Sequence, residues 1–467
     1  MFETTEGPVR AILVAVQLPD VDAVAFRSSV AELGRLARTL GVEVAGQVVQ
    51  RRTALHPGTV LGKGKLAELQ RMIGGEAAGV EADEDGDEDE DEDEDEDGED
   101  QADAIEREDA APGTDGAVQA VLVDHELTPS QARNLEKVTG IEVMDRTSVI
   151  LEIFRRHSRS RAAKAQVEIV RLQYLVPRLR EQGKGRDRQR GGIGGKGAGE
   201  SSLELDRRKI RDRIAELGRE IEALAEEQRT QRARRRDMSR VALCGYTNAG
   251  KSTLMRALTG SEVYVADKLF ATLDTTVRTL VPPAHPRILV SDTVGFIDKL
   301  PHGLVASFKS TLDEALEAGL LAHVVDASDP SFERQLQVTV ELLDEIGAHD
   351  VPRLLIFNKV DRVGDAAAEE AARVGLLARW PDAVVMSARR ASDVAALRQR
   401  LIDFFARDLV EREVLLPYDR QGLRGEIFAV CDVLEERSED DGIHLQVRAH
   451  PSSLERLARL VAERVSA

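Results

Sequence analysis

One glycine-rich segment, GYTNAGKS at residues 245–252, narrows the possible folds of this 467-residue chain more than any other feature. The apolar residues 240–244 before it read as a strand, and residues 253–258 after it read as a helix. In a GxxxxGK[S/T] segment between a strand and a helix, backbone N–H groups cradle phosphates. Lys251 would neutralise β- and γ-phosphate oxygens, and the Ser252 hydroxyl would bind Mg²⁺. The segment therefore predicts an α/β nucleotide-binding domain with a parallel sheet.

Two later segments favour guanine as the base. The strand 353–357 ends in Asn358-Lys359-Val360-Asp361, where the Asp361 carboxylate can accept hydrogen bonds from the guanine N1–H and the exocyclic amine. Adenine offers neither in that arrangement, so a buried acceptor would stay unpaired. Lys359 can lie over the base, and a backbone N–H of Ser387-Ala388-Arg389, after a strand at 383–386, can meet the guanine carbonyl. An isolated NKxD could be a surface turn, but its position after a P-loop favours base recognition.

The segment between these motifs has the features of a phosphate sensor. Asp292 follows the strand 288–291 and is placed to hold Mg²⁺ through water, and Gly295 can bring its N–H close to the γ-phosphate. A second Mg²⁺ ligand is expected from 269–276, LFATLDTT. Thr272 is favoured there, with Thr275 and Thr276 as competitors that spacing alone does not exclude.

The order of these segments is that of a P-loop GTPase domain, and five of them resemble the HflX family of ribosome-associated GTPases: GYTNAGKS, LFATLDTT, DTVGFI, NKVD and SAR. LTPSQARNLE at 127–136 and GGIGGKGAGESSLELDRR at 191–208 are similar to segments of that family. The resemblance implies that Thr272 closes on Mg²⁺ in the GTP state. It also implies that the N-terminal region docks on the 50S ribosomal subunit and that the protein separates stalled ribosomes.

Together these arguments define the predicted site. The catalytic candidates are Lys251, Thr272, Gly295 and Asn248, and the metal ligands are Ser252, Thr272 and Asp292. The nucleotide-binding candidates are Gly245, Tyr246, Thr247, Asn248, Ala249, Gly250, Lys251, Ser252, Thr253, Phe270, Ala271, Thr272, Leu273, Asp274, Asp292, Thr293, Val294, Gly295, Asn358, Lys359, Val360, Asp361, Ser387, Ala388 and Arg389.

The catalytic machinery lacks one common part. Phe296 follows Gly295, where Ras-like GTPases place a glutamine that orients water, and a phenyl ring cannot hydrogen-bond to water. We expect slow intrinsic turnover. Asn248 resembles an asparagine that lets some GTPases bind K⁺ beside the phosphates, and such a cation could act like an arginine finger. Hydrolysis dependent on K⁺, on the ribosome or on both is the resulting hypothesis, with a simple turn role for Asn248 as the alternative.

Outside the G domain at 238–408, strand–helix alternation predicts an α/β N-terminal domain at 1–146. A helical hairpin with a coiled-coil seam is expected at 147–237, and a small α+β module at 409–467, with strands at 424–431 and 443–449 and a helix at 451–464. The departures from the family are Gly195-Lys196 and Ala198 in place of Thr-Arg and Pro, and Thr275 in place of Pro.

A basic, glycine-rich loop at 183–199 joins the two helices of the expected hairpin. Its five cations can neutralise phosphates of structured RNA, although a plain linker would have a similar composition. These candidate RNA-binding residues are Lys184, Arg186, Arg188, Arg190 and Lys196.

The charge balance does not argue against an RNA partner. The formal net charge of −20 comes from 64 basic and 84 acidic residues, but residues 81–109 alone hold 21 acids and one base, which leaves 63 of each sign elsewhere. We expect 76–115 to be a disordered acidic insertion, either a spacer or a tail that competes with RNA for basic surface.

The remaining features concern location and assembly. Cys244 and Cys431 are far apart, which suits a reducing cytoplasm. No apolar run reaches the length of a membrane span. We expect a cytoplasmic protein, with peripheral membrane association left open, and we expect it to be monomeric. The rival functions are ribosome assembly, tRNA modification, and an RNA-binding scaffold with a structural nucleotide.

Overall fold

The computed structural model describes residues 9–74, 117–179, 202–233, 239–260, 269–270, 276–284, 286–300, 304 and 315–462. The chain forms two compact units, Met1–Ile153 and Phe154–Ala467. The acidic insertion at 76–115 and the basic loop at 183–199 lie outside the described residues, so the predictions made for them stay predictions.

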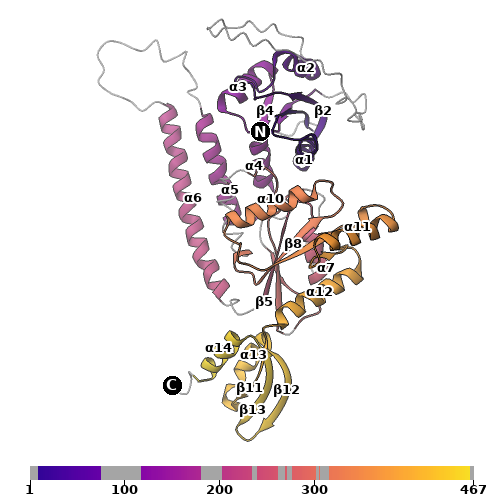
Figure 1. The fold of residues 1–467 in the computed structure, drawn as a ribbon. Coiled ribbons are helices and arrows are strands. Elements are labelled where there is room, and N and C mark those ends of the chain that lie inside the picture. Colours follow the sequence, from indigo (N-terminus) through magenta and orange to yellow (C-terminus); the bar gives the residue numbers. More distant parts are fainter. Residues whose placement is uncertain are drawn as a thin grey trace, which may run out of the picture. The chain divides into compact units, whose positions relative to one another are not determined.

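The first unit is built on a four-stranded parallel sheet with the order β2-β1-β3-β4 (Figure 1). Its strands are β1 (Val9–Gln17), β2 (Val42–Arg51), β3 (Ala120–Val123) and β4 (Glu142–Asp145). The connecting helices are α1 (Ala23–Leu40), α2 (Lys63–Ile73) and α3 (Pro129–Thr139). On one sheet face, Val14 of β1 belongs to the same buried cluster as Leu69 of α2 and Leu135 of α3. The strand–helix alternation predicted from the sequence is confirmed for these elements.

The start of α3 follows the predicted capping box. The Thr128 side chain accepts a hydrogen bond from the Gln131 N–H, and the Gln131 side chain accepts one from the Thr128 N–H at 3.0 Å. Pro129 occupies the first helical position, where no backbone N–H is required. The chain therefore enters α3 with its first backbone donors satisfied.

A buried ion cluster lies at the carboxyl end of β3 and β4. Nη1 of Arg146 lies 2.7 Å from Asp124, and Nη2 contacts Glu32 of α1. All three residues are at most 3% exposed. Removal of the Arg146 cation would leave two buried carboxylates without a compensating charge.

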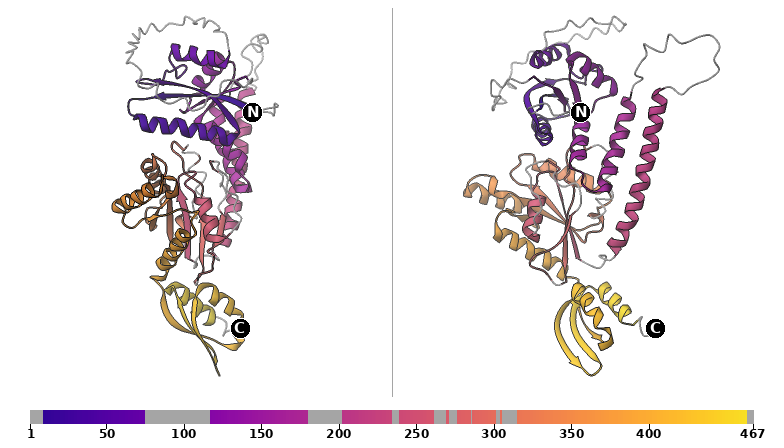
Figure 2. Two further views of the ribbon diagram at one scale, coloured as in Figure 1. Left: turned by 90° about the vertical axis from the view of Figure 1, so that its right-hand side faces the viewer. Right: turned by 180° about the vertical axis from the view of Figure 1, so that it is seen from behind.

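The helical region consists of α4 (Arg146–His157), α5 (Arg161–Leu175) and α6 (Ser202–Ala233). Helices α5 and α6 pack against each other, lie side by side in the right-hand view of Figure 2 and run antiparallel. Arg161 at the start of α5 pairs with Glu220 in the second half of α6. Along α6, five apolar residues at spacings of three and four are buried or half-buried, as expected for a coiled-coil seam: Ile210, Ile214, Leu217, Ile221 and Leu224. The predicted helical hairpin is confirmed over its described residues.

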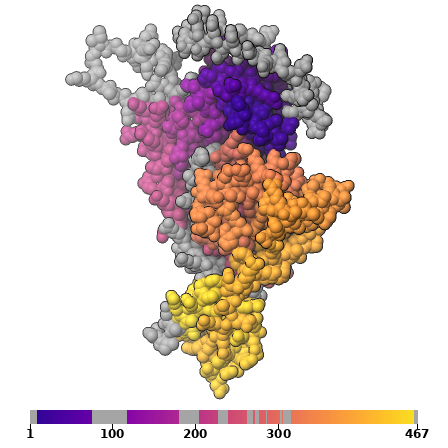
Figure 3. All heavy atoms as spheres, viewed as in Figure 1, coloured from indigo at the N-terminus to yellow at the C-terminus, as the bar shows by residue number. Residues whose placement is uncertain are grey.

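The G domain has a six-stranded sheet in the order β10-β9-β8-β5-β7-β6, parallel except for β6. The strands are β5 (Ser239–Gly245), β6 (Thr276–Thr279), β7 (Ile288–Asp292), β8 (Leu320–Asp326), β9 (Arg353–Asn358) and β10 (Val384–Val385). The described helices are α7 (Lys251–Thr259), α10 (Phe332–Glu345), α11 (Ala366–Arg379) and α12 (Ala391–Ala406). Leu254 of α7 and Leu397 of α12 share one core cluster with β5. Helix α11, orange in Figure 3, lies at the surface, and its residue Val374 is exposed.

The C-terminal residues form a three-stranded antiparallel sheet, β11 (Val410–Leu416), β13 (Gly442–Ala449) and β12 (Asp432–Glu439), in that order. Strand β13 and helix α14 (Pro451–Ala462) agree with the prediction, but 424–431 was wrong as a strand: Arg424–Val430 is helix α13. Its buried residues, Ile427, Val430 and the adjoining Cys431, follow a helical spacing of three and four. A short continuous apolar run does not distinguish a strand from a buried helix.

None of the described helices has the length and apolarity required to cross a membrane.

Candidate functional site

The GYTNAGKS segment forms a loop between β5 and α7 that only glycine permits at two positions. Gly245 has φ +140°, and a Cβ there would lie 2.1 Å from the Val324 carbonyl oxygen. Gly250 has φ +97°, and a Cβ would lie 2.3 Å from Asn358 Nδ2. Asn248 also has a positive φ, of 61°, which asparagine tolerates better than most residues. The loop therefore turns tightly enough for its backbone to approach a ligand.

Lys251 is buried at the first position of α7. Its Nζ donates to the carbonyl oxygens of Gly245 at 2.9 Å and of Tyr246 at 2.8 Å. Burial lowers the pKa of Lys251 to about 8, and nearby Asp292 opposes that shift. The ammonium group is thus held at the 245–252 loop, where bound phosphates would lie.

Two predicted metal ligands meet at the end of β7. Ser252 Oγ donates a 2.7 Å hydrogen bond to Asp292 Oδ2, and Asp292 is fully buried. A hydroxyl and a carboxylate are the hard oxygen ligands that Mg²⁺ prefers. The residues present therefore fit a Mg²⁺ ion beside the phosphate loop.

Gly295 and Phe296 run along the P-loop. Thr247 N–H donates to the Phe296 carbonyl at 2.7 Å, and Phe296 N–H donates to the Gly245 carbonyl at 3.1 Å. A Cβ on Gly295 would lie 2.9 Å from Thr247 Cγ2 and 3.1 Å from Lys251 Nζ. The Phe296 side chain is buried, so it packs in the interior at the position where Ras-like GTPases place a water-orienting glutamine.

Asn358 joins the phosphate loop to the loop at 387–389. Its Nδ2 donates to the Ala249 carbonyl at 2.9 Å, and its Oδ1 accepts from the Ala388 N–H at 2.9 Å. Asn358 is 1% exposed. The NH₂ and the carbonyl oxygen of its side chain are therefore both hydrogen-bonded within the protein, which fixes the spacing of the two loops.

The other NKxD residues lie beside Asn358. Lys359 has φ +62°, and its Nζ lies 2.7 Å from Asp326 Oδ2 at the end of β8. Val360 is buried and anchors the short turn that carries Asp361. The sequence argument missed Asp326, although an acid that ends the apolar strand 320–326 is the kind of signal that could have identified it.

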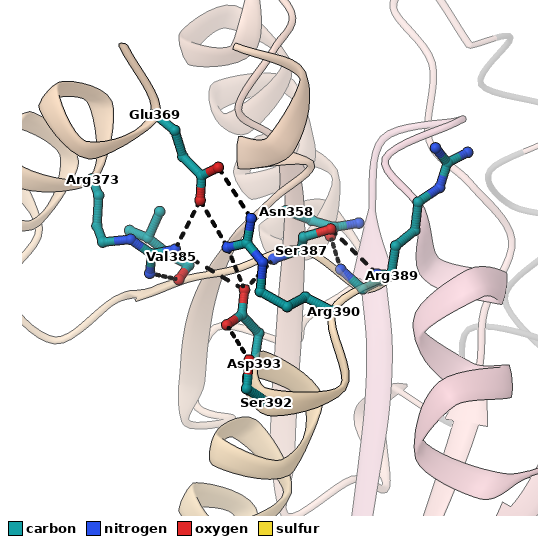
Figure 4. Close-up of polar contacts among 10 residues, drawn as sticks. Asn358, Glu369, Arg373, Val385, Ser387, Arg389, Arg390, Ser392 and Asp393 are labelled. Atoms are coloured by element: carbon teal, nitrogen blue, oxygen red, sulfur yellow. Dashed lines mark hydrogen bonds and ion pairs between the residues drawn. The ribbon is translucent and has the colours of Figure 1, made fainter. Parts of the chain in front are cut away.

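The loop at 387–389 follows β10 and precedes α12. Its Ser387 N–H donates to Asp393 Oδ2 at 2.9 Å, and its Arg389 N–H donates to Ser387 Oγ at 3.3 Å. Figure 4 shows these contacts together with an ion cluster of Glu369, Arg373, Arg390 and Asp393 beside them. The sequence argument did not include this cluster, because its members come from different helices.

Some predicted site residues are placed elsewhere or not described. Ala271, Thr272, Leu273, Asp274 and Thr275 lie outside the described residues, as do the five cations of the basic loop. Phe270 is 3% exposed and its ring centroid lies 4.5 Å from that of Phe154, so its side chain packs in the interior. Thr276 opens β6 opposite Asp292, and Thr293 Oγ1 donates to the Leu243 carbonyl at 2.7 Å.

The phosphate loop, the Asp292 segment, the NKxD turn and the 387–389 loop follow the parallel strands β5, β7, β9 and β10 of one sheet, at its carboxyl edge. This arrangement is that of a P-loop GTPase.

Comparisons with known proteins identify the family. Three family models match the chain: "GTP-binding GTPase N-terminal" at 27–83 and 98–155, "GTP-binding GTPase Middle Region" at 157–235, and "50S ribosome-binding GTPase" at 240–359. The GTPase HflX of Gluconacetobacter diazotrophicus is 53% identical over 98% of this chain and 100% of its own length. The GTPase HflX of Escherichia coli is 34% identical over 96% of this chain and 95% of its own length.

A solved GTP-binding protein from the archaeon Sulfolobus solfataricus, in complex with GDP, is similar with a TM-score of 0.42 at 21% identity, over 85% of this chain and 99% of that chain. The chain belongs to the HflX family of GTPases, and it is a GTP hydrolase.

Proposed function

We propose that the protein binds GTP at the carboxyl edge of the six-stranded sheet and uses its hydrolysis to control association with the large ribosomal subunit. The observation that supports this most directly is the match of residues 240–359 to a family model described as a 50S ribosome-binding GTPase. Splitting or rescue of stalled ribosomes is the specific role that we propose.

Guanine selection would fall to two parts of the site. The Asp361 carboxylate would accept from the ring N1–H and the exocyclic amine, and an amide of the 387–389 loop would donate to the base carbonyl. Support comes from Asn358, which bonds to both Ala249 and Ala388 and so sets the distance from phosphate loop to base loop. A rigid spacing between two recognition elements favours one ligand length.

The phosphates would be held by the P-loop amides and Lys251. When bound, Mg²⁺ would neutralise charge on the β- and γ-phosphates, held by Ser252 and Asp292, with Thr272 added in the GTP state. Gly295 would carry its N–H to the γ-phosphate, since even a methyl group at this position would crowd Lys251. The presence of the γ-phosphate would then order the segments around Thr272 and Gly295.

Hydrolysis would be slow without an activator. Phe296 is buried and offers no hydrogen bond to water, so positioning must come from another group. The Asn248 side chain would help to hold K⁺ beside the phosphates. Comparison of turnover in K⁺ and Na⁺, with and without 50S subunits, tests this, and fast hydrolysis in Na⁺ without ribosomes contradicts it.

The ribosomal contact would be made by the N-terminal region and by the basic loop of the hairpin, through Lys184, Arg186, Arg188, Arg190 and Lys196. Pelleting of ribosomes with the protein in GTP, GDP and a non-hydrolysable analogue tests the proposal. We expect co-sedimentation with 50S and loss of 70S particles in GTP. Binding only to immature subunits would favour an assembly role, and nucleotide-independent binding would favour a scaffold.

A further inference from the structure

The loop at 387–389 is anchored from the helix that follows it. Asp393 lies in the first turn of α12, and its Oδ2 accepts the Ser387 N–H at 2.9 Å. The N-cap residue of that helix, Arg390, makes no side-chain capping bond. The Asp393 carboxylate therefore reaches past the helix start to hold the first residue of the loop.

Arg390 directly follows the last residue of the loop and anchors that end. Its guanidinium donates to both carboxylate oxygens of Glu369 on α11, at 2.7 and 3.1 Å, and reaches Asp393 Oδ2 at 3.4 Å. Such a two-point bond fixes orientation as well as distance. The loop at 387–389 is thus tied to α11 through Arg390 and to α12 through Asp393.

Arg373 completes the arrangement from α11. It donates to the Val385 carbonyl at the end of β10 and lies 3.4 Å from Glu369. Figure 4 shows Glu369 between the two arginines, while the Arg389 side chain points away from them. The side chains of Glu369 and Asp393 are 19% and 16% exposed, so the cluster lies partly beneath the surface.

The charges of this cluster also lie near the base-recognition carboxylate. The pKa of Arg390 is raised, first by its hydrogen bond to Glu369 and then by the charges of Asp393, Glu369 and Asp361. The pKa of Glu369 is lowered, mainly by the hydrogen bond from Arg390. Arg390 and Glu369 therefore both stay ionised near neutral pH, and the bond between them persists there.

We infer that Arg390, Asp393 and Glu369 are positioning residues for guanine recognition. They hold the 387–389 loop so that the Arg389 N–H, whose bond to Ser387 Oγ is long at 3.3 Å, can turn to the base carbonyl. This inference rests on the proposed role of that loop. An ion pair that is partly open to solvent contributes little to global stability. A recognition amide displaced by a fraction of an ångström, however, loses its hydrogen bond to the ligand.

The test compares nucleotides that differ at one base position. The 6-thio analogue of GDP keeps the N1–H and the 2-amine but replaces the 6-carbonyl oxygen by a weaker acceptor, whereas IDP lacks only the 2-amine. In the full chain we expect Arg390→Ala and Asp393→Ala to lower the GDP over 6-thio-GDP affinity ratio roughly fivefold. The GDP over IDP ratio, read by Asp361, should change by less than about twofold.

Matched variants separate positioning from general damage. Asp393→Asn keeps an acceptor for the Ser387 N–H and should retain most of the 6-thio discrimination. Arg398→Ala is the control, because Arg398 lies on the same helix but donates to the Pro282 carbonyl. Fluorescence of Trp380, the only tryptophan, verifies folding of each variant.

The outcomes are distinct. A protein with no preference for GDP over ADP contradicts the proposed function itself. A protein that prefers GDP over ADP contradicts only this inference if it does not discriminate against 6-thio-GDP, if the variants keep the original 6-thio ratio, or if both ratios fall equally.

Discussion

Ser252 Oγ and Asp292 Oδ2 lie 2.7 Å apart, joined by a hydrogen bond between the start of α7 and the end of β7. The two residues are 40 positions apart in the chain, and the parallel pairing of β5 with β7 brings them together. A divalent cation here would be held by the Ser252 hydroxyl and, through water, by the Asp292 carboxylate. The sheet topology therefore brings the two proposed Mg²⁺-binding residues together without a ligand.

Substitution of Ser252 by alanine should remove one Mg²⁺ ligand and leave the P-loop backbone intact. We expect GDP affinity in Mg²⁺ to fall about tenfold, with little change in EDTA. Titration calorimetry in both buffers measures the difference. Ser291→Ala is the matched control, because that buried hydroxyl bonds to the Val241 carbonyl instead. An equal loss in both buffers would show that Ser252 acts on the loop and not through the metal.

Gly295→Ala should weaken a GTP analogue more than GDP. The added methyl would lie 2.9 Å from Thr247 Cγ2 and 3.1 Å from Lys251 Nζ, so the Gly295 segment must retreat from the γ-phosphate. We expect about a tenfold loss for the GTP analogue, the cost of one charge-assisted hydrogen bond. Gly375→Ala, in the middle of α11 with open space around it, is the control. An equal loss of affinity for GDP and for the GTP analogue would mean that the substitution distorts the P-loop and does not act on the γ-phosphate contact.

Asp361→Asn should exchange guanine preference for xanthine preference. Asparagine can donate to the 2-carbonyl of xanthine, while it leaves the guanine 2-amine without an acceptor. We expect at least about a 100-fold loss of GDP affinity and a gain for XDP. Asp382→Asn, an exposed acid before β10, should change neither value. Retention of GDP affinity would remove Asp361 from the site.

Arg146→Leu should destabilise the first unit without changing nucleotide binding. The substitution leaves Asp124 and Glu32 buried without their cation, at a cost of about 3–5 kcal/mol. Hydrogen–deuterium exchange in the full chain should show faster exchange in β3 and unchanged exchange in β5. Arg27→Leu, an exposed position on α1, provides the comparison. Exchange in β3 equal to that of the unmodified protein would mean that the cluster contributes no net stability.

The shape of the 245–252 loop was predictable from the sequence because its geometry is encoded locally. Positive φ at Gly245 and Gly250 demands glycine, and the strand–loop–helix order places Lys251 and Ser252. The capping box at Thr128 is local in the same way. Such features depend on only a few neighbouring residues, so they can be recognised in the sequence without knowledge of the fold.

The parts that could not be predicted depend on residues brought together by the fold. Arg146 meets Glu32 across 114 positions, and Arg390 meets Glu369 across 21. No short spacing signals these pairs. Helix α13 was mistaken for a strand for a related reason, since the packing partners of Ile427 and Val430 come from β13 and α14.

His323 should make the G domain sensitive to acid. It is 3% exposed on β8, and burial, with the positive charges of Arg353 and Lys251, lowers its pKa from 6.5 to about 3. A histidine whose pKa falls on folding is neutral in the native state, so the unfolded chain binds the extra proton. Its contribution is therefore complete above pH 6.5 and is lost as pH falls towards 3. At about pH 5.5 the loss is about 1.4 kcal/mol, the value of one pKa unit.

Urea unfolding followed by Trp380 fluorescence measures this loss within the G domain, because Trp380 packs on Phe357 of β9 with ring centroids 5.0 Å apart. His323→Gln, which has no charge to gain, should show a smaller fall in stability between about pH 7.5 and 5.5. His349→Gln, whose ring is largely exposed, should behave like the unmodified protein. If His323→Gln keeps the full pH dependence, another group causes the acid sensitivity, and a charged His323 must be accommodated in the folded state.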